Sequence, residues 1–342
     1  MSSILIQDTP YKTLSVKEIR PDFGAEVSGV DFEATSEEQL KELLAVLAKY
    51  AFTVHRSTPL TDDSHIAFSR LLGSLDDTRR FQSPNGSGPK SRLHHHPELF
   101  DASNLSHDGS ILSLSSPRAH GNKGNALFHV DSSFNPRRSS FSLLRAVVLP
   151  PAETGGRATE FADSRRAWED LPDHVKRELT ADGEGLVGAH CMAQSRKLGS
   201  PEFFAHVQPD QAPMARHKVV QTHAPSGRRN LYVGAHLHHL ETPAGERVSG
   251  SDRLVKYLNE FVGQEKYVVR VEWREPGDLV IWDNRAVLHR APGNWDGEGE
   301  YVRDLRRTTV HDGGEDAWGL NVVGTPMPTM ESWAGRPATL KA

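Results

Sequence analysis

The sequence predicts a mainly β protein, an antiparallel jelly roll with helices packed on its outside. Many short segments have the β-branched and aromatic content, or the alternating polarity, of strands. Few segments repeat apolar residues every three or four positions, as an amphipathic helix does. Many short strands with few helices are typical of this fold class. Strands are expected at residues 140–148, 217–223, 230–235, 268–273, 278–282 and 303–310.

The N-terminal part predicts the first strands and two helices. Strands are expected within 13–32 and at 51–54, and helices at 37–50 and 62–72. A Gly-containing turn at 23–27 is expected to separate the strands within 13–32. Thr61 is a suitable N-cap for the second helix, and Gly73 follows its end.

A long polar segment at 82–126 precedes the most informative motif of the chain. It is rich in Ser, Asn, Gly, His and Pro and shows little periodicity. A loop of that length is usually functional or disordered. We expect a lid over the functional site, with a disordered insertion as the alternative. Two further helices are expected later in the chain, at 163–171 and 252–263.

Size, charge and cysteine content limit the classes of protein. We expect one domain over 1–342, because 342 residues without a composition break suit a single β core with added helices. A net charge of −5 and a pI near 6.4 argue against a nucleic-acid binder. Cys191 is the only cysteine, which excludes an internal disulfide and a cysteine-rich zinc site. With neither a signal-peptide pattern nor a membrane-length apolar run, we expect a cytoplasmic protein without membrane contact.

The motif at 127–134 indicates a metal site. If this segment is extended, His129 and Asp131 project from the same face, with Val130 on the other. Two histidines and one carboxylate on one face of an octahedral ion form the triad of non-haem Fe(II) oxygenases. His289 is well placed to complete the set, because it follows the buried-looking strand at 278–282 and a polar turn.

Two arginines near the end of the core are expected to enter one pocket. If 303–310 is extended, Arg303 and Arg307 lie on the same face and Arg306 faces solvent. The planar guanidinium fork binds carboxylates through two charge-assisted hydrogen bonds. The pair therefore suits anionic ligands.

These motifs, in this order, resemble the TauD/TfdA family of Fe(II)- and 2-oxoglutarate-dependent dioxygenases. The resemblance covers roughly 13–310 and is closer to the 2,4-dichlorophenoxyacetate dioxygenase branch. It rests on the runs at 129–134, 154–156, 159–163, 222–224, 234–236, 282–285, 289–290 and 303–309. It implies a double-stranded β-helix of the cupin-like kind, with Fe(II) as the metal and 2-oxoglutarate and O₂ as cosubstrates.

The resemblance also implies roles for individual residues. The iron ligands would be His129, Asp131 and His289. Arg303 and Thr159 would bind 2-oxoglutarate, whereas Arg307, Asn125 and Ser132 would meet the substrate. Arg79 or Arg80 would add a cation to the substrate site, or lie on the solvated surface.

The implied reaction oxidises an unactivated C–H bond of a small carboxylate or sulfonate, with release of succinate and CO₂. The main alternative is a biosynthetic oxygenase of the same family that hydroxylates, desaturates or cyclises an amino acid. A non-catalytic cupin-like binding protein and a zinc hydrolase are weaker alternatives. The segment 312–342 is expected to be an extended C-terminal arm that contributes to the substrate pocket or to a subunit contact, which leaves a homo-oligomer open.

Other conspicuous side chains are expected to be structural. His94, His95 and His96 are expected to be exposed in the polar loop, and His223 and His236 to brace the core. The His236-Leu237-His238 pattern has no carboxylate at metal-binding spacing. Cys191 lacks a partner that would make it a nucleophile, and Trp168, Trp273 and Trp282 are expected to pack in the core.

Overall fold

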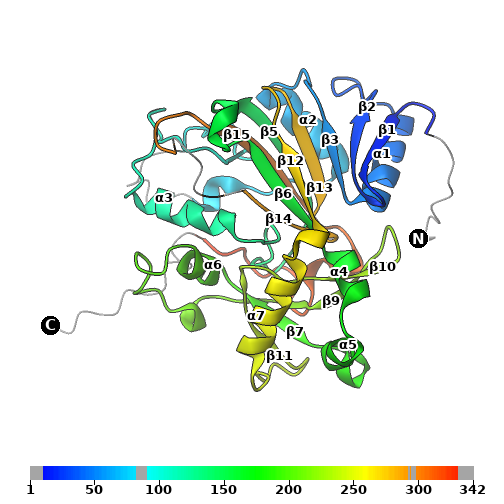
Figure 1. The fold of residues 1–342 in the computed structure, drawn as a ribbon, viewed down its shortest axis with the longest axis vertical. Coiled ribbons are helices and arrows are strands. Elements are labelled where there is room, and N and C mark those ends of the chain that lie inside the picture. Colours follow the sequence, from blue (N-terminus) through cyan, green and yellow to red (C-terminus); the bar gives the residue numbers. More distant parts are fainter. Residues whose placement is uncertain (1–10, 82–90, 292, 294–297, 330–342) are drawn as a thin grey trace.

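The computed structural model describes residues 11–81, 91–291, 293 and 298–329, and its fold is mainly β with flanking helices. A seven-stranded sheet has the order β1-β2-β3-β13-β5-β15-β4, and a second sheet has the order β12-β6-β14 (Figure 1). The first consists of β1 (Ser15–Arg20), β2 (Phe23–Ser28), β3 (Phe52–His55), β13 (Leu279–Asp283), β5 (Ser139–Val148), β15 (Asp304–His311) and β4 (Phe100–Asp101). The second consists of β12 (Val268–Glu272), β6 (Ala158–Asp163) and β14 (Val287–Arg290). This confirms the predicted jelly roll.

The two sheets share one apolar core. Side chains from both contribute to it, including Phe52, Phe161, Val269, Trp282 and Leu305. Successive side chains of strand β13 alternate between its two faces. Val280 and Trp282 belong to this core, whereas Leu279 and Ile281 pack into a second apolar cluster on the opposite face of the strand. Every residue of β13 is buried. A central strand that is covered on both faces can hold the polar turn after it in one fixed place.

Two helices cover the outer face of the larger sheet. They are α1 (Glu37–Tyr50) and α2 (Asp62–Leu72), whose bounds match the predicted ranges. Ser36 and Thr61 form capping boxes at their N-termini, with Gln39 and Ser64 as the reciprocal partners. Their apolar faces contribute residues such as Leu43, Leu47 and Phe68 to the core behind β5 and β13. This packing completes the predicted helical outer layer.

A second group of elements lies below the jelly roll in Figure 1. It includes α4 (Ser164–Asp170), α5 (Asp173–Leu179), α6 (Met192–Gly199) and α7 (Ser251–Val262), and a three-stranded sheet of β11 (Leu237–Glu241), β7 (Val187–His190) and β8 (Ala215–Lys218). A hairpin of β9 (Val220–His223) and β10 (Arg228–Leu231) follows β8. The predicted helices at 163–171 and 252–263 are confirmed as α4 and α7. The other helices and strands β7 and β11 were not predicted, because their segments lack a clear period.

Four predicted element bounds are wrong. The strand expected at 230–235 stops early, because β10 ends at Leu231. Residues 127–134 are not a strand: only His129 forms a bridge, and a turn begins at Asp131. The expected turn at 23–27 lies inside β2, because the chain reverses at Asp22, whose φ is 56°. The run 217–223 is divided between β8 and β9.

The predicted lid segment is partly ordered against the sheet. Residues 82–90 lie outside the described residues, whereas 91–126 contain β4 and α3 (Pro117–Asn122). β4 pairs with β15 through Phe100 and Arg307. Arg92 ties the segment to the sheet, because its guanidinium contacts the carboxylates of Asp101 at 3.0 Å and Asp304 at 2.8 Å.

The described part of the C-terminal arm packs against the chain. The Ala317 carbonyl accepts from the Arg138 N–H at 2.9 Å, and the Asn321 side chain accepts from the Arg216 N–H at 2.9 Å. Residues 330–342 of the expected arm lie outside the described residues. None of the helices in the described part of the chain has the length and apolar character needed to cross a membrane.

Candidate active site

The structure brings His129, Asp131 and His289 together. One potential ligand atom of each lies within 4.8 Å of the others, and all three residues are buried. The Asp131 Oδ1 atom lies 3.9 Å from His129 Nε2 and 3.7 Å from His289 Nε2. Among the described residues this is the only such cluster. The predicted triad is therefore assembled in space, although its first two members are not on a regular strand.

Backbone pairing and a tight turn explain this convergence. The N–H of His129 donates to the carbonyl of His289 at 3.0 Å, and the reverse bond is 2.9 Å long. This antiparallel bridge places the two imidazoles side by side, with ring centroids 4.3 Å apart. Ser132 has a φ of 58°, so the chain turns directly after Asp131. The Ser139 hydroxyl holds the turn by donating to the Asp131 carbonyl at 2.8 Å.

The protonation states of the triad suit a metal ion. Burial lowers the pKa of both His129 and His289, which keeps both imidazoles neutral. Burial alone would raise the pKa of Asp131, but the nearby Arg307 guanidinium, with the hydrogen bond from Ser142, brings that pKa to about 2. Neutral imidazoles and an ionised carboxylate are the forms that bind metal ions.

The orientation of His129 also suits a ligand. Its Nδ1 atom lies 2.8 Å from the carbonyl oxygen of Leu127. A carbonyl can only accept, so Nδ1 carries the hydrogen and Nε2 keeps a free lone pair toward Asp131. Histidine ligands commonly have this second hydrogen bond, which fixes the tautomer and the ring. The donor set therefore fits Fe(II), which accepts two imidazoles and a carboxylate.

Arg303 contacts the chain at the start of β6, the strand that carries Thr159. The guanidinium of Arg303 donates to the carbonyls of Gly156 at 2.9 Å and Ala158 at 3.5 Å. Within the described ranges no carboxylate forms an ion pair with it, and burial lowers its pKa to about 10 against the opposing effect of Glu298. A desolvated cation without a counter-ion favours an anionic ligand. The Thr159 hydroxyl is also fixed, since it accepts from the Trp273 indole N–H at 3.1 Å.

Arg307 enters the triad itself. Its Nη1 atom donates to Asp131 Oδ1 at 2.6 Å, and its guanidinium lies over the ring of Phe100, 4.7 Å from the centroid. Its Nε atom is buried without a partner in the structure. An acidic group bound to Arg307 would thus lie next to the metal position.

The prediction for Arg306 is wrong. Its side chain is only 17% exposed because it contacts the carboxylates of Asp62 and Asp304. The side chains of Arg306 and Arg307 point to opposite faces of β15, as expected for a strand. The face that carries Arg306 is covered by α2, whose first turn is acidic.

The remaining predicted substrate residues have different surroundings. Ser132 is buried in the turn after Asp131, whereas the side chain of Asn125 is exposed. The Asn125 carbonyl accepts from the N–H of Ala291 at 2.9 Å, close in sequence to His289. Arg79 pairs with Asp77 at the surface, and Arg80 pairs with Asp76 at 2.6 Å. Neither arginine contacts a triad residue.

Most structural predictions for the other histidines and aromatics are confirmed, but His96 is partly buried and lies 3.7 Å from Asp63. His94 and His95 are exposed. His223 braces the turn after β13 by contacting Asp283 at 3.0 Å, and His236 contacts the Ser133 hydroxyl at 3.0 Å. Trp168, Trp273 and Trp282 are buried, as is Cys191, whose pKa burial raises to about 11. That thiol is therefore not activated as a nucleophile.

Sequence reasoning missed two residues next to Asp131, namely Ser142 and Asn284. The Ser142 hydroxyl donates to Asp131 Oδ2 at 2.7 Å, and the Asn284 side chain accepts from the N–H of Asp131 at 3.2 Å. Asn284 belongs to the recognised 282–285 motif, so a signal for it existed. Ser142 lies within a long apolar strand and carries no comparable signal.

Gly234 sets how closely the chain packs behind His129. A Cβ atom at this position would lie 2.9 Å from His129 Cα and 2.9 Å from the Phe128 carbonyl oxygen, and φ is 125°. We expect Gly234→Ala to lower the free energy of unfolding by about 2–4 kcal/mol through backbone strain and overpacking. Denaturant unfolding measures this. Gly313→Ala is the control, because a Cβ atom at Gly313 would meet nothing within 4 Å, and an equal loss in both variants would contradict the account.

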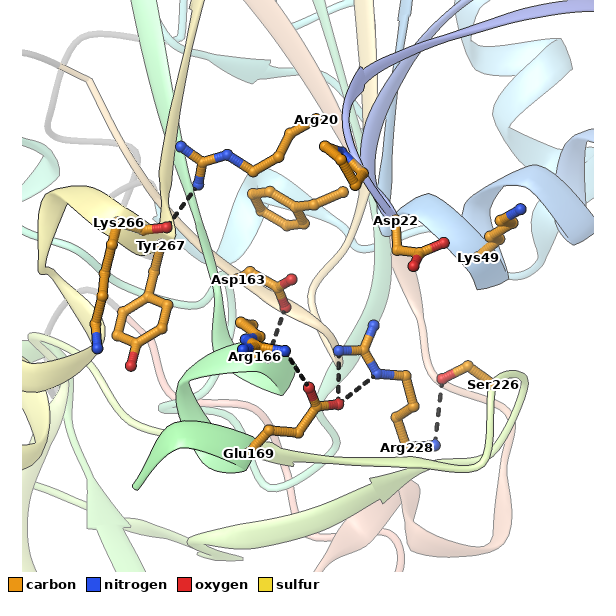
Figure 2. A pocket seen from close by; sticks show the side chains of 12 residues that line it. Arg20, Asp22, Lys49, Asp163, Arg166, Glu169, Ser226, Arg228, Lys266 and Tyr267 are labelled. Carbon is orange, nitrogen blue, oxygen red and sulfur yellow. Dashed lines mark hydrogen bonds and ion pairs between the residues drawn. The ribbon is translucent and has the colours of Figure 1, made fainter. Parts of the chain in front are cut away.

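A charged pocket lies elsewhere on the molecule. It has a volume of about 670 Å³ and is lined by charged residues, including Arg166, Glu169 and Arg228, but by none of the candidate site residues (Figure 2). Arg228 donates to Glu169 at 2.9 and 2.7 Å, and Arg166 lies 3.5 Å from the same carboxylate. Arg166 also contacts Asp170 at 3.1 Å, so both arginines have carboxylate partners within the protein. The pocket therefore does not replace the triad as the candidate active site.

Comparison with known proteins agrees with this site. The family described as "Taurine catabolism dioxygenase TauD, TfdA family" matches residues 15–309. The α-ketoglutarate-dependent 2,4-dichlorophenoxyacetate dioxygenase of Cupriavidus pinatubonensis is 36% identical over 295 residues, which cover 86% of this chain and 96% of the relative. An (S)-phenoxypropionate/α-ketoglutarate-dioxygenase of Sphingobium herbicidovorans is 30% identical over 283 residues, covering 80% and 87%.

A solved structure gives the same result. AAD-2 in complex with Mn(II) and N-oxalylglycine superposes with a TM-score of 0.71 and 31% identity, covering 88% of this chain and 98% of that one. Together with the buried His-Asp-His cluster, these similarities identify an enzyme that uses Fe(II), 2-oxoglutarate and O₂. The chain belongs to the TauD/TfdA family of 2-oxoglutarate-dependent dioxygenases.

Proposed function

We propose that His129, Asp131 and His289 hold the Fe(II) ion and that Arg303 and Thr159 bind 2-oxoglutarate. The single observation that carries this proposal is the convergence of the three ligand atoms within 4.8 Å in a buried site. The uncompensated charge of Arg303 supports the second part, because a dicarboxylate supplies the anion that this cation lacks. When bound, iron and the cosubstrate supply the oxidising power for C–H cleavage.

The residues around the metal position determine where a substrate binds. Arg307 can hold a carboxylate through its guanidinium fork while Phe100 covers the cation. An anion fixed there has one C–H bond held close to the metal position, which is the positioning that catalysis requires. Asp131 and Ser132 are both buried, which also keeps water away from the proposed metal position.

We propose a small aryloxy carboxylate as the substrate. The names of the two relatives, which act on a phenoxyacetate and a phenoxypropionate, support this class. The aromatic ring of Phe100 beside Arg307 is a suitable contact for an aryl group. Hydroxylation of the carbon next to the ether oxygen gives a hemiacetal, which collapses to a phenol and a glyoxylate-type oxo acid.

Succinate formation with a substrate panel tests this proposal. The Fe(II)-loaded enzyme is supplied with 2-oxoglutarate, O₂ and one candidate, namely phenoxyacetate, 2-phenoxypropionate, an alkylsulfonate or an amino acid. We expect an aryloxy acid to stimulate succinate formation and to release a phenol. Stimulation by the amino acid alone would favour the biosynthetic alternative, and no succinate with any acid would contradict the assignment.

Replacement of Arg303 should specifically weaken 2-oxoglutarate binding. Arg303→Lys keeps the charge but loses the planar fork, so we expect KM for 2-oxoglutarate to rise by about tenfold or more. KM for the aryloxy acid should change much less. Arg290→Lys is the matched control, because Arg290 pairs with Glu160 at 2.7 Å and its side chain is 39% exposed. A larger rise in KM for the aryloxy acid than for 2-oxoglutarate would indicate that Arg303 binds the substrate and not the cosubstrate.

Several broader expectations belong to the same proposal. We infer that the chain acts in the cytoplasm as a single domain over 1–342, on a small anionic substrate rather than on nucleic acid or a membrane. The segment 82–126 is proposed as a lid, which the contact between Phe100 and Arg307 supports for its described part. Light scattering measures whether the chain assembles into a homo-oligomer.

A further inference from the structure

We propose that Ser142 and Asn284 are positioning residues of the metal site, which orient the Asp131 carboxylate so that only Oδ1 faces the two histidines. This inference rests on the proposed role of His129, Asp131 and His289 as metal ligands. It assigns a function to two buried polar side chains that do not belong to the ligand set.

Four groups form one continuous hydrogen-bonded chain. The Trp282 indole Nε1–H donates to Asn284 Oδ1 at 3.0 Å, and Asn284 Nδ2 donates to the Ser142 hydroxyl at 2.9 Å. The Ser142 hydroxyl donates in turn to Asp131 Oδ2 at 2.7 Å. The exposed fractions are 0% for Trp282 and Ser142, 1% for Asn284 and 3% for Asp131, so water does not compete for these bonds.

The chemistry of the groups fixes the direction of this chain. An indole N–H can only donate, and so can the backbone N–H of Asp131, which also contacts Asn284 Oδ1 at 3.2 Å. The atom that receives both must therefore be the amide oxygen of Asn284, which places its NH₂ group toward Ser142. Because Ser142 accepts from that NH₂ group, its own hydrogen is free for Asp131 Oδ2. The donor role of Trp282 thus determines which end of the Asn284 amide is oxygen and which is nitrogen, and this fixes the order of donors.

The sheet holds the donors rigidly. Ser142 on β5 and Trp282 on β13 are directly paired in the antiparallel register. The N–H of Asn284 donates to the Ser140 carbonyl at 2.7 Å, which fixes the residue after β13 against β5. Positioning groups on central strands are more precise than groups on loops. The loop residue Asp131 is thereby oriented by two neighbouring strands.

The hydrogen bond from Ser142 determines which oxygen of Asp131 is available to a metal ion. Its Oδ2 atom is engaged by Ser142, whereas Oδ1 lies 3.7 Å from His289 Nε2 and 3.9 Å from His129 Nε2. The carboxylate is thus prepared to act through one oxygen. Arg307 contacts Oδ1 at 2.6 Å, so the Ser142 hydroxyl is the group that fixes Oδ2. Without it, Oδ2 would lose its donor, and the NH₂ group of Asn284 would lose its acceptor in a buried site.

Metal affinity and ligand geometry test the proposal without a measurement of turnover. Mn(II) binding is followed by the electron paramagnetic resonance signal of the free ion, and visible absorption of the Co(II)-loaded protein reports the coordination. We expect Ser142→Ala to weaken Mn(II) binding by about 10–100-fold, as is typical when a partner of a metal ligand is removed. The Co(II) spectrum should change as well, which a general loss of stability in a folded variant would not cause.

The control and a second variant keep the test decisive. Ser140→Ala removes a buried hydroxyl of the same strand that donates to the carbonyls of Val310 and His311, both at 3.3 Å, and we expect wild-type metal binding. Ser142→Cys preserves the approximate size of the side chain, but a thiol donates only weakly, so we expect weaker Mn(II) binding. This variant provides the test if Ser142→Ala does not fold. Wild-type affinity and an unchanged Co(II) spectrum in whichever folded Ser142 variant is obtained would overturn the proposal.

His129→Ala separates this inference from the assignment of the metal site. If His129→Ala loses Mn(II) binding while the Ser142 variants retain it unchanged, the ligand set stands and the positioning role fails. If His129→Ala binds Mn(II) as tightly as the wild type, the proposed ligand set itself fails. The two results are therefore distinguishable in one series of titrations.

Discussion

His129→Ala should reduce succinate formation on the order of a thousandfold, because loss of a metal ligand removes the several kcal/mol that a bound metal contributes to catalysis. His129 is the best-defined of the three candidate ligands. Its Nδ1 is engaged by the Leu127 carbonyl, and its Nε2 points into the site. The variant should also lose tight Fe(II) binding, measured by anaerobic titration, while it keeps its circular dichroism spectrum.

The matched control is His94→Ala. His94 is exposed in the polar segment and contacts the Ser91 carbonyl at 3.1 Å, so its loss should leave metal content and turnover unchanged. Equal losses in the two variants would indicate that the effect on turnover does not come from the triad.

Arg307→Ala should reduce kcat/KM for the acidic substrate by about two to three orders of magnitude, because truncating one partner of a largely buried charge pair costs about 2–5 kcal/mol. Its guanidinium lies 2.6 Å from the Asp131 carboxylate, next to the proposed metal position. The variant should still bind 2-oxoglutarate, since Arg303 is intact. Steady-state kinetics with each of the two acids varied in turn measures this separation.

Arg306→Ala is the neighbouring control for this prediction. Arg306 contacts Asp62 and Asp304 and does not reach the triad, so its loss should lower stability modestly and leave the substrate KM unchanged. A rise in KM for 2-oxoglutarate in Arg307→Ala that equals the rise for the substrate would contradict the assignment of Arg307 to the substrate.

The convergence of the three candidate ligands could be predicted from the sequence, because these residues combine a specific chemistry with a specific order. The motifs around His129, Asp131 and His289 predict one shared site, and the structure brings the three side chains together. The helices 37–50 and 62–72 were also predicted with the correct bounds, since apolar spacing and capping residues agree in both. At these positions the local sequence pattern and the tertiary fold favour the same structure.

The sequence was insufficient where tertiary packing decides the conformation. The segment 127–134 has strand-like residues, yet the bridge to His289 and the positive φ of Ser132 impose a turn. Arg306 was assigned to solvent because strand alternation cannot show that α2 covers that face. Ser142 was missed because a serine within an apolar strand gives no sign of its distant partner.

A crystal of the enzyme, grown anaerobically with Fe(II), 2-oxoglutarate and phenoxyacetate, tests the central claim most directly. The account predicts one metal ion bound by His129, Asp131 and His289, with a 2-oxoglutarate carboxylate on Arg303. It also predicts the phenoxyacetate carboxylate on Arg307. A metal ion bound at other side chains, or a cosubstrate that does not contact Arg303, would contradict it.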